Sequence, residues 1–299
     1  MMIDFHGIIT PIVTPFKNTQ GQEINFDALA RQINRLISEK VSAIFVLGSN
    51  GEFHVMDSCE KLELIKESAR IINKRVPLFA GTGACSTREA VYLSKKACEL
   101  GADVLSIIPP YYMQPNDNEL FTHYQAIALN VDRPIILYNI PKAVGYALSP
   151  SLVARLASID KIVGIKDSSG DKTLIGQYIE ICKEHNLSYL IGSDSKISYA
   201  YSRGACAAIA GTSNLIPEVT VKLWDALEEG NECLAHQLQN DLEPLRSVLK
   251  LGTVPSVIKR AITLRTGIDV GSARRPVHNI DEHIEAKINR MLEYYTQAN

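Results

Sequence analysis

The sequence predicts an α/β protein, a (β/α)8 TIM barrel with a C-terminal helical extension. Two observations carry this prediction: eight short apolar segments follow one another along the chain, and amphipathic segments separate them. The 299 residues suit such a barrel, which typically needs about 250. No G-x-G-x-x-G motif stands at a strand–helix turn, so the open sheet of dinucleotide-binding proteins has no support.

The eight apolar segments are expected to be parallel strands. Each is apolar at consecutive positions and not at alternate ones, which is typical of strands buried on both faces. In chain order they are residues 7–13, 43–47, 77–80, 104–108, 135–137, 162–165, 189–191 and 207–210.

The segments between the strands have the apolar spacing of helices. In residues 26–39, Leu29, Ile33 and Leu36 fall on one face of a helix. Residues 86–99 show the same spacing. Each predicted strand is therefore followed by a helix that can cover the outside of the barrel.

The strand pattern stops after about residue 215, and only helical segments follow. The first would complete the barrel, and the others would form an appendage. We therefore predict a barrel over residues 1–230 and a C-terminal helical region over residues 231–299. The four helical segments are residues 218–229, 232–249, 255–266 and 281–297.

The charge balance and the apolar runs exclude several classes of protein. The formal charge is −2, so a basic surface for nucleic acid or for acidic membranes is not expected. No apolar run reaches the roughly 18 residues of a membrane-spanning helix. Residues 1–6 carry an acid and no basic region, unlike a signal peptide. A cytoplasmic protein is therefore expected.

The six cysteines lie far apart and never form a C-x-x-C motif. In a reducing cytosol this arrangement is typical of free thiols that pack as small apolar side chains. A structural zinc site is therefore not expected, and no other metal is implied.

Lys166 is the first candidate for catalysis. In a barrel of this kind the active site lies at the C-terminal ends of the strands. Lys166 follows the apolar run Ile162-Val163-Gly164-Ile165, which places an amine at the barrel mouth above an apolar floor. Partial desolvation disfavours the ammonium form and leaves the nucleophilic amine that imine formation with a ketone requires. The alternative is a strand-end lysine that points to solvent or pairs with Asp167.

Other strand ends supply groups that suit such a reaction. The phenols of Tyr138 and Tyr112 can shuttle protons if a hydroxyl, such as that of Ser49, links them. The turn Gly48-Ser49-Asn50-Gly51 can hold a carboxylate with backbone N–H groups. Each feature alone is also typical of core packing or of a tight turn with Glu52 near the next helix N-terminus. Together on one rim they indicate an active site.

A set of motifs runs along nearly the whole chain. They are Gly7-Ile8-Ile9-Thr10-Pro11, Thr14-Pro15-Phe16, Gly48-Ser49-Asn50-Gly51-Glu52, Gly81-Thr82-Gly83, Pro110-Tyr111-Tyr112, Leu137-Tyr138-Asn139-Ile140-Pro141 and Gly164-Ile165-Lys166-Asp167. In order and in the spacing from Tyr138 to Lys166, the motifs resemble the dihydrodipicolinate synthase / N-acetylneuraminate lyase superfamily. The resemblance implies a class I, Schiff-base-forming lyase that binds pyruvate on a (β/α)8 barrel.

The resemblance also implies roles for the residues of these motifs. Lys166 would form the imine with the pyruvate carbonyl, and Tyr138 would act as the general acid/base. Ser49 would link Tyr138 to Tyr112, which would reach in from a neighbouring subunit. Ser49 and Asn50 would hold the pyruvate carboxylate. Family members are commonly homotetramers built as dimers of dimers, and no cofactor is implied, since the lysine itself supplies the electron sink.

Four further residues are expected to contact substrate. Gly48 and Ile209 are two of them. Asp194 and Ser195 fall where sialic acid lyases bind sugar hydroxyls, although those enzymes often have an acidic residue in place of Ser195. Hydroxyl binding is therefore predicted at this turn, whereas sialic acid itself is not favoured.

Ala143 and the turn Gly48-Ser49-Asn50-Gly51 indicate the branch of the family. Dihydrodipicolinate synthases usually have Gly-Thr-Thr-Gly-Glu in this turn, and an arginine at the Ala143 position anchors the carboxylate of their aldehyde substrate. A methyl group does not replace a bidentate guanidinium, and Lys142 offers only an adjacent point charge. The Gly-Ser-Asn-Gly-Glu-Phe turn looks more like aldolases of 2-keto-3-deoxy sugar acids or of 4-hydroxy-2-oxoglutarate.

The main prediction is therefore an aldolase that cleaves or forms the C–C bond between pyruvate and an aldehyde, on a 2-keto-3-deoxy sugar acid or a similar hydroxy-2-keto acid. One alternative is a 4-hydroxy-tetrahydrodipicolinate synthase, which condenses pyruvate with aspartate semialdehyde. Another is a dehydratase that eliminates water from the imine. An alternative of a different class is a non-catalytic barrel that binds sugar acids, which loss of the lysine, a tyrosine or the linking hydroxyl would favour.

Overall fold

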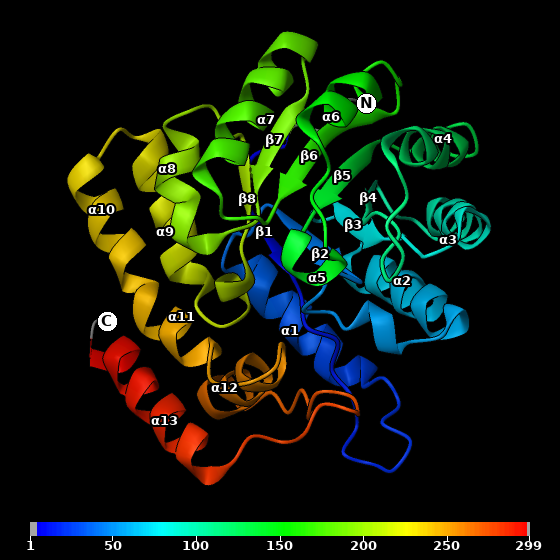
Figure 1. The fold of residues 1–299 in the computed structure, drawn as a ribbon. Coiled ribbons are helices and arrows are strands. Elements are labelled where there is room, and N and C mark those ends of the chain that lie inside the picture. The colour runs from blue at the N-terminus through cyan, green and yellow to red at the C-terminus, as the bar shows by residue number, and fades with distance from the viewer. Residues whose placement is uncertain (1–4, 298–299) are drawn as a thin grey trace.

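The computed structural model describes residues 5–297, in which eight parallel strands form a closed barrel surrounded by helices (Figure 1). Residues 1–4 of the opening segment, on which the expectation about a signal peptide depends, lie outside the described residues. The barrel closes between the first and last strands, where Gly7 pairs with Ala207 and Ile9 with Ile209. The strands are β1 (Gly7–Pro11), β2 (Ala43–Val46), β3 (Leu78–Gly81), β4 (Val104–Ile107), β5 (Ile135–Asn139), β6 (Ile162–Asp167), β7 (Ser188–Ile191) and β8 (Ala207–Ile209).

Helices of varied length follow the strands and cover the outside of the barrel (Figure 1). The α-helices of the barrel are α1 (Phe26–Ser38), α2 (Ser58–Ile72), α3 (Thr87–Glu99), α4 (Asp117–Ala128), α5 (Pro141–Val144), α6 (Pro150–Leu156), α7 (Lys172–His185), α8 (Ile197–Tyr201) and α9 (Pro217–Glu228). Three short 3-10 helices, η1 (Phe53–Val55), η2 (Asp194–Lys196) and η3 (Gly211–Asn214), lie at strand ends. The remaining helices are α10 (Glu232–Asp241), α11 (Glu243–Leu249), α12 (Ser256–Thr266) and α13 (Glu282–Gln297).

The prediction of a barrel with a C-terminal helical extension is confirmed, but the single helix predicted over residues 232–249 is wrong. The structure divides it into α10 and α11 at Leu242. Pro244 lies in the first turn of α11, where its missing N–H leaves no helical hydrogen bond unmade. In the middle of one continuous helix the same proline would remove a hydrogen bond and clash with the preceding turn.

Two apolar clusters account for the continuous apolarity of the strands. One fills the barrel interior and includes Ile9, Phe45 and Leu190. The other lies between the strands and the helices and includes Ile8 and Ile44. Neighbouring residues of one strand therefore point to opposite sides of the sheet, and both sides are buried.

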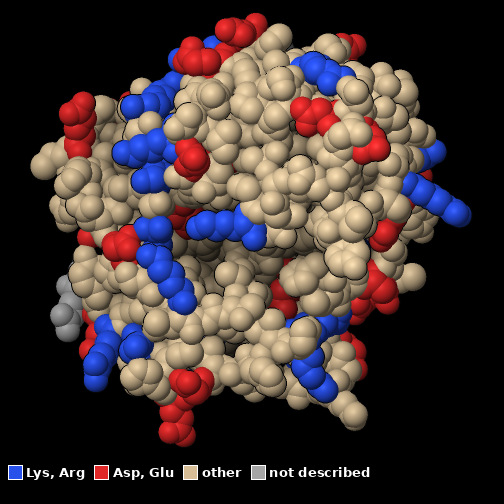
Figure 2. All heavy atoms as spheres, in the orientation of Figure 1, with Lys and Arg blue, Asp and Glu red and all other residues tan. Residues whose placement is uncertain are grey.

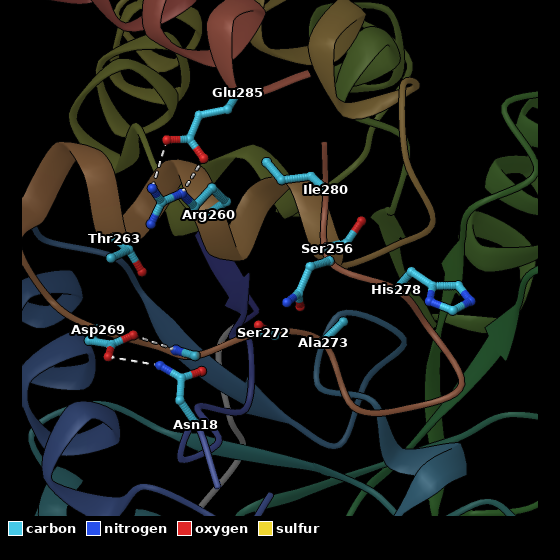
Figure 3. A pocket seen from close by; sticks show the side chains of 12 residues that line it. Asn18, Ser256, Arg260, Thr263, Asp269, Ser272, Ala273, His278, Ile280 and Glu285 are labelled. Atoms are coloured by element: carbon cyan, nitrogen blue, oxygen red, sulfur yellow. Dashed lines mark hydrogen bonds and ion pairs between the residues drawn. The ribbon is translucent and has the colours of Figure 1, made fainter. Parts of the chain in front are cut away.

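The C-terminal helices are tied to each other and to the loop after β1 by polar contacts (Figure 3). Arg260 on α12 makes two hydrogen bonds to Glu285 on α13, at 2.9 and 2.7 Å. Asp269 accepts a hydrogen bond of 3.1 Å from Asn18. These residues border a surface cavity of about 240 Å³. α12 is therefore tied to α13, and the segment that follows α12 is tied to the loop after β1.

Within residues 5–297, no helix is both long and apolar enough to cross a bilayer. The same residues contain no group of three or more His, Cys, Asp or Glu side chains arranged to hold a metal ion.

His123 on α4 is a buried imidazole that stays neutral at pH 7. Its Nδ1 lies 2.9 Å from Thr87 Oγ1, and burial lowers the pKa of the ring to about 4. In the unfolded chain the pKa of histidine is about 6.5, so between these two values the unfolded state binds more protons. Stability linked to His123 is therefore present above about pH 6.5 and is lost as the pH falls through this window.

We expect acid to lower the free energy of unfolding, with His123 contributing at most about 1.4 kcal/mol for each pH unit below its unfolded pKa. Urea unfolding at about pH 7 and about pH 4.5 measures this loss. The His123→Gln variant should lose less stability than the wild type over that interval, whereas His185→Gln, at an exposed position, should lose as much. An equal loss in His123→Gln and the wild type would contradict the assignment.

Candidate active site

Lys166 lies inside the mouth of the barrel and is 3% exposed. Its register partner on β5 is Tyr138, and its Nζ lies 3.9 Å from the centroid of the Tyr138 ring and 4.9 Å from that of Phe45. No hydrogen bond or ion pair to this Nζ is present within residues 5–297. A Cβ added to Gly192 would come within 3.0 Å of Lys166 Cε. The amine therefore lies in an apolar and aromatic setting, and the glycine that follows β7 leaves room for its stem.

Asp167 does not pair with Lys166, because the two neighbouring residues of β6 point to opposite sides of the sheet. The Asp167 carboxylate is buried and accepts hydrogen bonds from Asn139 Nδ2 at 2.8 Å and from the Tyr189 hydroxyl at 3.1 Å. It also accepts bonds of 2.9 Å from the backbone N–H and the hydroxyl of Ser169. This network joins β5, β6 and β7. The alternative of a Lys166–Asp167 ion pair is therefore wrong.

Tyr138 and Ser49 are brought together from β5 and from the turn after β2. The Ser49 Oγ and the Tyr138 hydroxyl are 3.2 Å apart, which is hydrogen-bond distance. Tyr138 is buried, and its ring packs edge-on against Phe45. The hydroxyl link that the sequence predicts is present between these two residues.

The turn from Gly48 to Gly51 is closed by a hydrogen bond from the Gly51 N–H to the Gly48 carbonyl at 3.0 Å. The backbone N–H groups of Ser49 and Asn50 have no acceptor within residues 5–297. Asn50 lies against the start of η3, because a Cβ added to Gly211 would come within 3.1 Å of Asn50 Nδ2. The turn therefore offers two adjacent N–H groups and a hydroxyl, which is a suitable arrangement for a carboxylate.

Tyr112 is not part of the site of its own chain. It is 94% exposed and has a φ of 80°, a left-handed conformation that is rare for a non-glycine residue. Its neighbour Tyr111 is half-buried and packs edge-on against Phe53. Burial, with Cys85 nearby, raises the pKa of Tyr111 to about 12. The predicted contact between Tyr112 and Ser49 is not present within one chain.

The turn after β7 has a structural contact that the sequence did not indicate. The Asp194 carboxylate accepts hydrogen bonds from the N–H groups of Gly211 at 3.2 Å and Thr212 at 2.8 Å. Asp194 therefore holds the start of η3, which limits its capacity to accept hydrogen bonds from further donors. Ser195 is half-buried in η2, and Ile209 lies in the barrel interior on β8.

Glu52 is a residue whose environment the sequence did not predict. Its side chain does not cap the following helix. Instead it is buried, and Oε1 accepts a hydrogen bond of 3.0 Å from Lys259 of α12. The partner lies more than 200 positions away in the chain, so no local sequence pattern links them.

The surface around this region carries no large patch of one charge. Figure 2 shows a face that is hollowed near its middle, with acidic and basic side chains scattered around it. In the same orientation α5, which carries Ala143, lies over the middle of the barrel (Figure 1). Ala143 and Lys142 are both exposed. Within α5, Lys142 is the one side chain that can supply charge to a substrate.

Comparisons with known proteins cover nearly the whole chain. Residues 4–295 match the dihydrodipicolinate synthetase family. A 4-hydroxy-tetrahydrodipicolinate synthase of Methanoculleus marisnigri is 34% identical over 288 residues, which are 96% of this chain and 98% of that protein.

Solved structures of similar chains have the same fold. A dihydrodipicolinate synthase of Bacillus anthracis superimposes with a TM-score of 0.92 at 31% identity and covers 98% of this chain and 99% of its own. YagE of Escherichia coli K12, a prophage protein of the dihydrodipicolinic acid synthase family in complex with pyruvate, has a TM-score of 0.91 at 30% identity and covers 97% and 98%.

Proposed function

Because the chain belongs to the dihydrodipicolinate synthetase family and is therefore a lyase, we propose that Lys166 binds pyruvate as a Schiff base. The observation that carries the proposal is the position of its Nζ, 3.9 Å from the Tyr138 ring centroid, where the Tyr138 hydroxyl is linked to Ser49. A desolvated amine that has no anionic partner is suited to attack a ketone.

In the proposed mechanism the Lys166 amine attacks C2 of pyruvate, and water leaves as the imine forms. Loss of a proton from the methyl group gives an enamine, which forms a C–C bond with an aldehyde; the reverse sequence cleaves that bond. Tyr138 transfers the protons, with Ser49 as its hydrogen-bond partner. The Ser49 and Asn50 N–H groups hold the pyruvate carboxylate. Tyr112 is proposed to complete the relay of a neighbouring subunit, which its exposure favours.

Two observations point to different aldehydes as the second substrate. Relatives named 4-hydroxy-tetrahydrodipicolinate synthase support condensation with aspartate semialdehyde, and they favour this alternative over the sugar-acid aldolase that we expected first. Ala143 is the observation that favours the aldolase, because α5 has no guanidinium to anchor the carboxylate of aspartate semialdehyde. Synthase activity is thus the first activity to assay, followed by pyruvate release from 2-keto-3-deoxy sugar acids and 4-hydroxy-2-oxoglutarate.

Lys166→Ala is expected to abolish the covalent trapping of pyruvate by borohydride, because it removes the amine that lies beside Tyr138 in the barrel mouth. Intact-protein mass spectrometry measures the adduct of one reduced pyruvate per chain. The matched control is Lys161→Ala, which removes an exposed lysine just before the same strand and should be trapped like the wild type. Trapping in Lys166→Ala at the wild-type extent would place the imine elsewhere.

Tyr138→Phe is expected to retain imine formation but to lower kcat about 10²- to 10⁴-fold, the usual contribution of a positioned acid/base. Steady-state kinetics and borohydride trapping together separate the two effects. Ser49→Ala should lower kcat less, and the double variant should be no slower than Tyr138→Phe alone, since both changes remove one shared hydrogen bond. Wild-type turnover of Tyr138→Phe would exclude this tyrosine from proton transfer.

Ala143→Arg tests the role of α5 in selecting the aldehyde. If the site lacks a carboxylate anchor, the new guanidinium should raise kcat/KM for aspartate semialdehyde about ten- to a hundredfold, which corresponds to one charge-assisted pair. Ala143→Met controls for side-chain size without charge. No gain in Ala143→Arg, together with high synthase activity in the wild type, would show that another residue already binds that carboxylate.

A further inference from the structure

The turn after β2 is held from a distance by a buried lysine of the C-terminal helices. Lys259 on α12 is 0% exposed. Its Nζ donates to Glu52 Oε1 at 3.0 Å, to the Thr14 carbonyl at 2.9 Å and to the Ser272 carbonyl at 2.7 Å. The ammonium group has three N–H donors, so all of them are used. Burial lowers the pKa of Lys259 to about 8, although Glu52 opposes that shift.

Both carboxylate oxygens of Glu52 bond to the C-terminal part of the chain. Oε2 accepts a hydrogen bond of 2.7 Å from the backbone N–H of Arg274. The segment that carries Ser272 and Arg274 is itself fixed, because Asp269 bonds to Asn18 on its other side (Figure 3). The Glu52 side chain is therefore anchored in a rigid frame and not in the barrel mouth.

Glu52 in turn fixes the end of the substrate turn. Its φ is 58°, in the left-handed region that a non-glycine residue rarely adopts without support. Its backbone N–H donates to the Ser49 carbonyl at 3.2 Å. The Thr14 hydroxyl, next to the carbonyl that Lys259 binds, donates to the Gly51 carbonyl at 2.7 Å. Two separate chains of contacts thus run from Lys259 to the turn.

We propose that Lys259 is a positioning residue for 2-keto-acid binding. Through Glu52 and Thr14 it sets the orientation of the turn, so that the Ser49 hydroxyl and the N–H groups of Ser49 and Asn50 face the substrate carboxylate. This inference rests on the proposed function of Lys166. Through Lys259, α12 would contribute to pyruvate binding without touching the substrate.

The test compares Lys259→Met with Arg260→Met, which removes the neighbouring cation on the same helix and its pair with Glu285. The readout is the pyruvate concentration that gives half-maximal borohydride trapping of Lys166, measured beside thermal unfolding. Lys259→Met should raise that concentration about tenfold or more, and Arg260→Met should leave it unchanged. A folded Lys259→Met protein with the wild-type value would overturn the inference.

A second measurement does not depend on the folding of a variant. Binding at the turn and order around Lys259 are coupled reciprocally, so pyruvate should slow amide hydrogen exchange of wild-type residues 272–274. Exchange in α13 serves as the control and should not change. Unchanged exchange at residues 272–274 in a protein that borohydride traps with pyruvate would refute the role of Lys259. Absence of trapping in the wild type would instead count against the proposed function itself.

Discussion

Closure of the barrel between β1 and β8 is the constraint on which the rest of the structure depends. Once Gly7 pairs with Ala207, every strand has two neighbours, and no edge is left unpaired. The carboxyl ends of all eight strands then meet at one rim. Lys166 and Tyr138 meet through the pairing of β5 with β6. The closed rim brings Ser49, from the turn after β2, to the same place.

In the closed barrel, side chains alternate along β6 and place the Lys166 amine and the Asp167 carboxylate on opposite sides of the sheet. Lys166 points into the barrel, where its Nζ lies beside the rings of Phe45 and Tyr138. Asp167 points outward and is saturated by hydrogen bonds from three neighbouring residues. If the strand were shifted by one residue, the carboxylate would face the mouth and the amine would face the helices. The position of the lysine amine inside the barrel is thus a consequence of register.

The turn after β2 depends on both local and distant contacts. Its hydrogen bonds between Gly48 and Glu52 are local, but they leave Glu52 in a left-handed conformation that needs support. The support comes from α12 and from the segment after it. The C-terminal helices therefore contact the barrel beside one of its left-handed residues, and a buried pair of charges joins the two.

The sequence by itself determined the fold class and the eight strands, because strands of a buried parallel sheet are apolar at consecutive positions. It also determined which residues lie at the rim, because the carboxyl ends of all strands in such a barrel lie at the same rim. Only the tertiary structure decided which groups touch. It separated Asp167 from Lys166, engaged Asp194 with η3, excluded Tyr112 from the site of its own chain, and paired Glu52 with Lys259. Such contacts join residues up to about 200 positions apart, and no periodicity or motif encodes a distance of that kind.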